Sequence, residues 1–135
     1  MSPEKTEILI QKYPSIFSNL KYFECGDGWF DIIDSLCFRL EQEAKNESYR
    51  LPEEEAKLNY PVASQVKEKF GGLRFYIYGG SERMYGMISM AENFSFKICE
   101  GCGNKGSMKG KAWVYTMCNP CWHQYETRQL LKSTV

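Results

Sequence analysis

The amino-acid sequence predicts an α+β fold, in which helices pack on a β-hairpin and a small zinc ribbon follows. Two segments, 28–46 and 82–95, carry apolar residues at helical spacing. Between them, residues 64–78 alternate apolar and polar side chains around a Gly-Gly pair, which is typical of a hairpin. Two Cys-x-x-Cys pairs then follow in the C-terminal part. Helices separated from a local antiparallel pair indicate the α+β class rather than alternating βαβ units.

The N-terminal part predicts two helices separated by a glycine-containing break. Ser2-Pro3-Glu4 is typical of a helix start, and an apolar rhythm continues from there to Leu20 with a bend near Pro14. The rhythm ends at Cys25-Gly26-Asp27-Gly28, where Asp27 is the expected N-cap of the helix over 28–46. The apolar stripe expected to be buried on this helix consists of Trp29, Ile33, Leu36, Cys37 and Leu40. The polar segment 45–61 is expected to be a connector that is helical in part.

The hairpin segment predicts two faces of different character. A two-residue turn at Gly71-Gly72 would pair Phe70 with Leu73 and Lys69 with Arg74. Because side chains alternate along a strand, one face is then apolar except for Glu68. The residues of that face are Val66, Glu68, Phe70, Leu73, Phe75 and Ile77. The opposite, basic and aromatic face holds Gln65, Lys67, Lys69, Arg74, Tyr76 and Tyr78.

The C-terminal part predicts a third helix followed by the ribbon. Ser81 is the expected N-cap of the helix over 82–95. Its apolar stripe is Met84, Met87, Ile88, Ala91 and Phe94. A strand over 112–117 and a short helix from Gln124 to about Leu131 complete the chain. We therefore expect an α+β domain over 1–95 and a ribbon with its terminal helix over 96–135.

Four cysteines are expected to bind one zinc ion: Cys99, Cys102, Cys118 and Cys121. Fifteen residues separate the two Cys-x-x-Cys pairs, which is typical of zinc sites. Two reduced pairs or two disulfides are the alternatives, and the metal spacing favours zinc over both. Four thiolates close a tetrahedral site and leave no position for water, so the metal is expected to organise structure.

Nothing in the sequence indicates an enzyme. The single histidine, His123, follows a predicted zinc ligand by two residues and is expected to be an exposed neighbour of the site. No glycine-serine elbow or phosphate-loop lysine is present. Asp27, Asp31 and Asp34 lie on one helix side; capping and solvation are the favoured roles, and a divalent-ion site is the alternative.

Two further cysteines and two tryptophans are expected to be structural. Cys25 and Cys37 are interpreted as buried free thiols rather than as a redox pair. Trp29 and Trp113 are interpreted as core anchors rather than as stacking platforms.

The basic and aromatic hairpin face is the predicted ligand site. Lys69 opposite Arg74 would be a like-charge pair that an anion such as phosphate neutralises. Lys67 adds charge, while Tyr76 and Tyr78 offer rings on which a base can stack. An ordinary solvated strand face is the alternative interpretation.

Net charge and hydropathy limit the kinds of binding partner and the cellular compartment that we expect for this protein. Residues 1–60 hold 12 acidic and 7 basic side chains, and residues 61–135 hold 5 acidic and 10 basic ones, so the chain is neutral overall. A neutral chain is a poor general coat for DNA, which needs many cationic contacts. No run of about 18 apolar residues and no signal peptide is seen, and six cysteines with a predicted thiolate site fit a reducing cytosol.

Three segments resemble a family of small phage and bacterial proteins. These are Glu24-Cys-Gly-Asp-Gly-Trp-Phe-Asp-Ile-Ile-Asp34, Gln65-Val-Lys-Glu-Lys-Phe-Gly-Gly-Leu-Arg-Phe-Tyr76 and the two Cys-x-x-Cys pairs, so the match runs from about residue 24 to 122. The resemblance supplies no catalytic residues. It implies a phage-encoded accessory protein that works in the cytoplasm of a bacterial host.

Two functions follow as expectations. The first is a binding module that captures a small anionic, nucleotide-like ligand or blocks a host protein, which would include countering a nucleotide-signalled host defence. The second is a zinc-ribbon adaptor for nucleic acid or a transcription complex, which would use Lys105, Lys109 and Lys111 between the cysteine pairs. Neutral charge disfavours the second.

Overall fold

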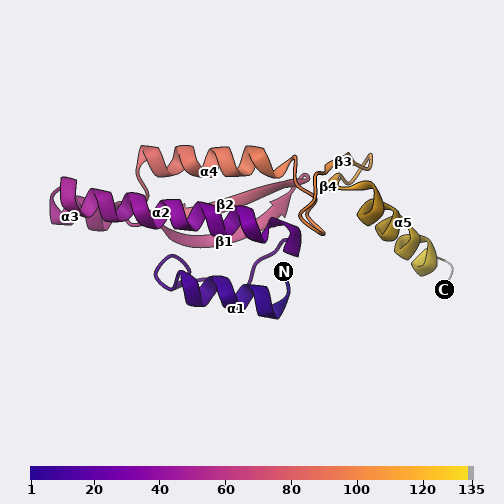
Figure 1. Cartoon of the computed structure of the whole chain (residues 1–135), viewed down its shortest axis with the longest axis horizontal. Helices are drawn as coiled ribbons and strands as arrows, with labels where there is room; N and C mark the ends of the chain where they lie inside the picture. The colour runs from indigo at the N-terminus through magenta and orange to yellow at the C-terminus, as the bar shows by residue number, and fades with distance from the viewer. Residues whose placement is uncertain (134–135) are drawn as a thin grey trace.

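A computed structural model describes residues 1–133 and confirms the α+β class. Its helices are α1 (Pro3–Lys12), the 3-10 turn η1 (Asp27–Trp29), α2 (Phe30–Arg50), α3 (Glu53–Leu58), α4 (Glu82–Ser95) and α5 (Asn119–Ser133). Its strands are β1 (Val62–Lys69), β2 (Gly72–Tyr78), β3 (Ser107–Lys109) and β4 (Tyr115–Met117), and they form two antiparallel pairs, β1-β2 and β3-β4. Figure 1 shows the β1-β2 hairpin behind α2, with α4 along one side, α1 along the other and the ribbon with α5 at one end.

The first two helices begin where the sequence predicts, but the cap of the second differs. Ser2 caps α1, since its hydroxyl accepts from the Lys5 N–H at 3.3 Å. Asp27 was expected to cap the long helix, and this is wrong. Asp27 opens the 3-10 turn instead, and its carboxylate accepts from the Ser2 N–H at 2.7 Å. The side chain therefore ties the start of α1 to the start of α2.

Helix α2 is longer than the expected 28–46. The predicted stripe from Trp29 to Leu40 is buried as expected, and the buried face continues through Glu43, Ala44 and Glu47. Because Glu43 and Glu47 are acidic, the apolar pattern of the sequence did not predict that the buried face continues. The Glu43 carboxylate is matched by Arg83 Nε at 3.2 Å, which allows this burial. The rest of the connector over 45–61 includes the short helix α3.

The hairpin is confirmed, but its turn lies one residue earlier than expected. Phe70 and Gly71 form the turn with φ of 54° and 84°, and Lys69 pairs with Gly72. From Gln65 to Lys69, each β1 residue therefore faces a β2 residue two positions earlier than expected, which keeps these residues on their predicted faces. Phe70 alone changes place, since it leaves the apolar face and is 69% exposed. The Glu68 carboxylate accepts from the Gly71 N–H at 2.8 Å and closes this turn.

Neighbouring segments cover both edges of the hairpin. Residues 23–25 run parallel to β1, because the Glu24 N–H donates to Val66 O and Glu24 O accepts from the Glu68 N–H, both at 2.9 Å. On the β2 edge, the Leu73 N–H donates to Ser95 Oγ at 2.9 Å and the Phe75 N–H to Glu92 at 2.8 Å. Helix α4 thus supplies side-chain acceptors to an edge that would otherwise be unpaired.

The core lies between the helices and the apolar face of the hairpin. Phe17 makes edge contacts with Phe23 and Phe75, with ring centroids 5.0 and 6.2 Å apart. Helix α4 has the predicted bounds and the predicted Ser81 cap, and it buries Met84 and Ile88 in this core. Phe94, the last member of the predicted apolar stripe, is exposed.

The ribbon differs from the sequence expectation in three respects. Strand β3 was not expected, β4 begins at Tyr115 rather than at 112, and α5 begins at Asn119 rather than at Gln124. Trp113 was expected to anchor a core, but it is 80% exposed on the loop before β4. Within its described residues α5 buries none fully, and Figure 1 shows it projecting away from the helices. Residues 134–135 of the expected second domain lie outside the described residues.

Candidate metal centre and the hairpin face

The four predicted cysteines come together in one cluster. The Sγ atoms of Cys99, Cys102, Cys118 and Cys121 all lie within 4.8 Å of one another. Cys102 and Cys118 approach to 3.6 Å. Tetrahedral zinc with Zn–S bonds of about 2.3 Å implies sulfurs roughly 3.8 Å apart, whereas a disulfide requires about 2.05 Å. All four are free thiols, so the cluster can coordinate a metal ion.

Backbone hydrogen bonds shape the first cysteine pair. The Cys99 N–H donates to Asn104 O at 2.7 Å, and the Gly103 N–H returns to Cys99 O at 2.9 Å. The Glu100 N–H donates to Thr116 O at 2.9 Å, which joins this turn to β4. These bonds hold the two sulfurs of the pair on one side of the turn.

The second cysteine pair lies at the N-terminus of α5. Cys118 precedes the helix by one residue and Cys121 lies in its first turn, where the Trp122 N–H donates to Cys118 O at 3.0 Å. The positive end of a helix dipole favours negative charge, so this position suits thiolate ligands.

The thiols already differ in acidity within the cluster. Burial raises the pKa of Cys99, but N–H groups of Cys118, Cys102 and Gly101 lower it more, to about 7. Hydrogen bonding to Cys118, burial and the other thiols raise the pKa of Cys121. A bound cation would favour the thiolate form of the four cysteines and displace their protons.

The 3-10 turn η1 and Gly26 before it pack directly on the first cysteine pair. The Gly28 N–H donates to Glu100 O at 2.8 Å, and Trp29 Nε1 donates to Ile98 O at 2.9 Å. A Cβ at Gly28 would lie 2.0 Å from Cys99 O, so only glycine allows this approach. The Gly26 N–H donates to the Glu100 carboxylate at 2.9 Å, while burial raises the pKa of Glu100 to about 7.

The hairpin turn packs on the same ribbon from β4. Thr116 is fully buried, and its hydroxyl donates to Gly71 O at 2.6 Å. A Cβ at Gly72 would lie 2.3 Å from the Phe96 ring. The Gly-Asp-Gly-Trp segment, the Gly-Gly turn and the cysteine pairs, far apart in the sequence, are therefore one packed unit.

The five predicted ligand residues share the outer face of the hairpin, but their pairing differs from the expectation. Lys67, and not Lys69, faces Arg74, while Lys69 pairs with Gly72 and lies 5.6 Å from the Phe70 ring. Tyr76 and Tyr78 are exposed on the same face. Over residues 1–133 none of these three cations forms an ion pair with a carboxylate.

Sequence reasoning missed two members of this face, Tyr22 and Glu24. The segment 22–25 alternates exposed and buried residues, and Glu24 lies beside Lys67 as a parallel bridge partner. This alternation was the signal in the sequence that could have found them. A shallow hollow of about 540 Å³ opens at this edge of the face. It is lined by Asn19, Leu20, Lys21, Tyr22, Glu24, Ser64, Gln65 and Tyr78.

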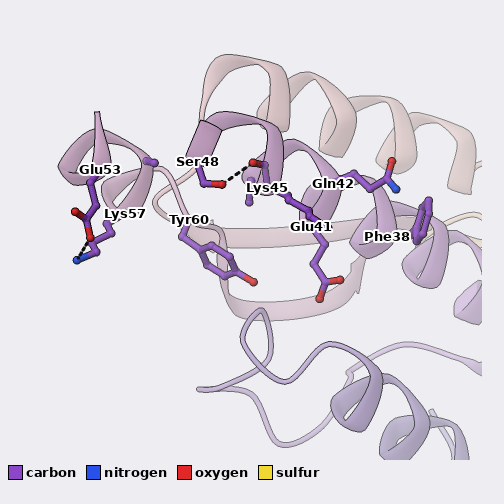
Figure 2. A pocket seen from close by; sticks show the side chains of 10 residues that line it. Phe38, Glu41, Gln42, Lys45, Ser48, Glu53, Lys57 and Tyr60 are labelled. Atoms are coloured by element: carbon purple, nitrogen blue, oxygen red, sulfur yellow. Dashed lines mark hydrogen bonds and ion pairs between the residues drawn. The ribbon is translucent and has the colours of Figure 1, made fainter. Parts of the chain in front are cut away.

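Two larger hollows lie away from this face. Figure 2 shows the one between α2 and α3, about 730 Å³ in volume, where Tyr60 and Phe38 accompany Glu41 and Lys45. Its remaining charges form the Glu53–Lys57 ion pair at 3.1 Å, so its acids balance its lysines. The second, about 590 Å³, is an apolar groove between α2 and α4. Neither concentrates positive charge as the hairpin face does.

The acids at the start of α2 serve the fold. Asp27 accepts from Ser2, and Asp34 accepts from Tyr13 Oη at 2.6 Å and Lys12 Nζ at 2.9 Å. Burial raises the pKa of Asp34, but these two hydrogen bonds lower it more. These contacts tie α1 to the start of the long helix, so Asp27 and Asp34 act neither as caps nor as simply solvated groups.

The remaining candidates occupy separate places. Cys25 and Cys37 are buried, as expected, and burial raises the pKa of Cys25 to about 12. His123 is exposed, as expected. Of the ribbon lysines, Lys105 and Lys111 are exposed, while Lys109 donates to Asn119 Oδ1 at 2.6 Å.

Comparison with known proteins finds no family description, curated protein or solved structure that matches this chain. Within residues 1–133, no helix has the length and apolar character needed to cross a bilayer.

Proposed function

We propose that this protein is a small binding module, organised by a structural zinc ion, that captures a small anionic ligand of nucleotide type on the outer hairpin face. The observation that carries the proposal is the cross-strand pairing of Lys67 with Arg74, neither of which forms an ion pair with a carboxylate within residues 1–133. The nature of the ligand, its biological role and the identity of the metal as zinc are all parts of this proposal.

The donor set supports zinc as the metal. Four thiolates are soft ligands, which suit zinc and disfavour magnesium and calcium. The cluster includes no carboxylate or imidazole, and four sulfurs complete a tetrahedron. The metal would therefore hold the ribbon in shape, and the ribbon would hold the hairpin turn and the start of α2.

The electrostatics of the hairpin support an anionic ligand. Like charges directly opposite each other on a sheet are destabilising, so a phosphate between Lys67 and Arg74 would remove a repulsion as it binds. Lys69 adds a third cation nearby, while Tyr76 and Tyr78 offer exposed rings for stacking.

The resemblance to small phage and bacterial proteins supports a biological setting for such a ligand. A phage-encoded accessory protein that sequesters a nucleotide would counter a host defence that uses nucleotides as signals. Blocking a host protein through the same face is the other form that this role would take.

Calorimetry on the zinc-loaded full chain tests the proposed site. We expect nucleoside monophosphates to bind, and Lys67→Ala with Arg74→Ala to weaken them at least tenfold, because both cations that face the phosphate are lost. Lys105→Ala with Lys111→Ala is the matched control, since it removes two exposed ribbon charges. Unchanged zinc content and thermal unfolding would show that each variant is folded. If both double variants lost the same amount of nucleotide affinity, or if neither lost any, the result would contradict a site on the hairpin face.

One observation favours a second candidate, an adaptor for nucleic acid. Trp113 is 80% exposed and lies two residues after Lys111, which is a combination that single-stranded nucleic acid can use for stacking and charge. In that case the ribbon variant would lose more affinity than the hairpin variant. Binding to an oligonucleotide would also fall steeply between two salt concentrations.

A further inference from the structure

The hollow at the edge of the hairpin face has the polar lining expected of a base-binding pocket. It lies where residues 22–25 join β1, next to the irregular pairing between Ala63 and Gln65. Such irregularities open a sheet locally and are frequent beside functional sites. Tyr22 and Tyr78 both line the hollow, and each is 66% exposed, so aromatic surface is available there to a flat ring.

Glu24 gives this hollow a specific hydrogen-bonding character. Its two carboxylate oxygens lie 3.3 and 3.4 Å from Gln65 Nε2, which are long contacts that a better donor can replace. The side chain is exposed and has no cationic partner among the described ion pairs. A carboxylate accepts hydrogen bonds with both oxygens and donates none.

From this arrangement we infer that the hollow takes the base of a guanine nucleotide, with Glu24 accepting from its Watson–Crick edge. This inference rests on the proposed function, because it assigns the base of the ligand whose phosphate meets the hairpin cations. Guanine carries two adjacent donors on that edge, N1–H and the N2 amino group, which match two carboxylate oxygens. Adenine and cytosine place a lone pair beside their amino group, and a carboxylate repels it.

The spacing of the face suits the two ends of one nucleotide. Glu24 lies beside Lys67, and Lys67 lies opposite Arg74, so the three side chains form one row across the face. Neighbouring strands lie about 4.8 Å apart, so the row separates Glu24 from Arg74 by roughly 10 Å. The base and the phosphate therefore have separate partners along the row. Lys21, which lines the hollow, offsets the negative charge of Glu24 near an anionic ligand.

The test compares guanosine and adenosine 5′-monophosphates with inorganic phosphate by calorimetry on the zinc-loaded full chain. We expect the guanine nucleotide to bind at least tenfold more tightly than the adenine nucleotide. Glu24→Gln should remove that preference by weakening the guanine nucleotide at least tenfold, while adenine nucleotide binding stays the same or improves. Glu54→Gln, a change at an exposed acid on α3, is the matched control and should keep the preference.

The outcomes separate this inference from the proposed function. Equal binding of the two nucleotides to the unaltered protein would overturn the guanine assignment and leave the anion site standing. A guanine preference that survives Glu24→Gln would overturn the role of Glu24. If neither nucleotide nor phosphate binds, both the inference and the proposed function fail. Glu24→Gln should fold normally, because residue 24 pairs with β1 through its backbone.

Discussion

Glycine at position 28 is required by a single close approach between distant parts of the chain. The Gly28 Cα faces the backbone of the first cysteine pair, where a Cβ would lie 2.0 Å from Cys99 O and 2.6 Å from Gly103 N. Both neighbours are backbone atoms, and they cannot move without disturbing the cysteine cluster. This residue therefore links the turn before α2 to the cysteine cluster although it is not itself a member of the cluster.

We expect Gly28→Ala to destabilise the protein by about 1–3 kcal/mol, the usual cost of overpacking a tight contact. The added methyl should also weaken metal retention, since it pushes against Cys99. Denaturant unfolding and competition with a chromogenic chelator measure the two effects. Gly86→Ala is the control, because a Cβ there meets nothing within 4 Å on α4. That change should be neutral or stabilise by up to about 1 kcal/mol. Equal behaviour of the two variants would contradict the packing argument.

The burial of single residues could be predicted where apolar side chains repeat at helical spacing. It could not be predicted where the buried side chains are polar. Trp29 and Leu40 are buried as the pattern predicts, but Glu43 and Glu47 lie on the same buried face. Glu43 meets Arg83 from α4, which is a tertiary contact that local sequence does not show. Within the described residues, Glu47 Oε2 is buried without a hydrogen-bond partner. Trp113 fails in the opposite direction, because its aromatic character alone predicted burial.

At the scale of elements, α2 is the central support of the fold. Its buried stripe runs for most of the helix and packs into the single core shared with the hairpin and α4. Because isolated helices are marginal in water, the stability of α2 comes mainly from this packing.

Leu36→Ala is expected to reduce the free energy of unfolding by roughly 2–5 kcal/mol, the range for a large-to-small change in a core. Leu36 is 5% exposed and lies in the middle of the stripe. Urea unfolding followed by circular dichroism measures the change. Ser35→Ala, at the exposed neighbouring position, should alter stability by less than about 0.5 kcal/mol. A similar small effect at Leu36 would mean that the stripe does not support the core.

The hairpin shows which part of an element can be read from sequence. Alternation predicted the two strands and their faces, because the side-chain period depends on the strand alone. The turn position depends on tertiary contacts as well. The Glu68 carboxylate on the Gly71 N–H and the Phe96 ring against Gly72 select Phe70-Gly71 as the turn. One of these contacts comes from β1 just before the turn and the other from Phe96 after α4, so the Gly-Gly pair alone was misleading.

At the scale of the whole molecule, the cysteine cluster joins segments that the sequence keeps apart. The first pair contacts Gly26, Gly28 and Trp29, and β4 contacts the hairpin turn through Thr116. The Cys-x-x-Cys spacing predicted that the four cysteines come together, since the geometry of each pair is local. It did not predict the docking, which depends on how α2 and the hairpin pack. A metal ion at this point would therefore stabilise more than the ribbon.

Zinc is expected to support the whole fold. Purified protein should hold one zinc per chain by elemental analysis, and Cys118→Ser should lower that content because one of four ligands is lost. Cys25→Ala is the control, since it changes a buried cysteine outside the cluster and should keep the zinc.

Trp29 reports whether the metal also supports the contact between the ribbon and the rest of the fold, because it is buried and donates to Ile98 O beside the first pair. In a Trp113→Phe, Trp122→Phe background, removal of zinc by a chelator should shift the Trp29 emission to the red as the contact opens. Full zinc occupancy in Cys118→Ser would contradict the metal assignment. Loss of zinc without any change at Trp29 would instead confine the role of the metal to the ribbon.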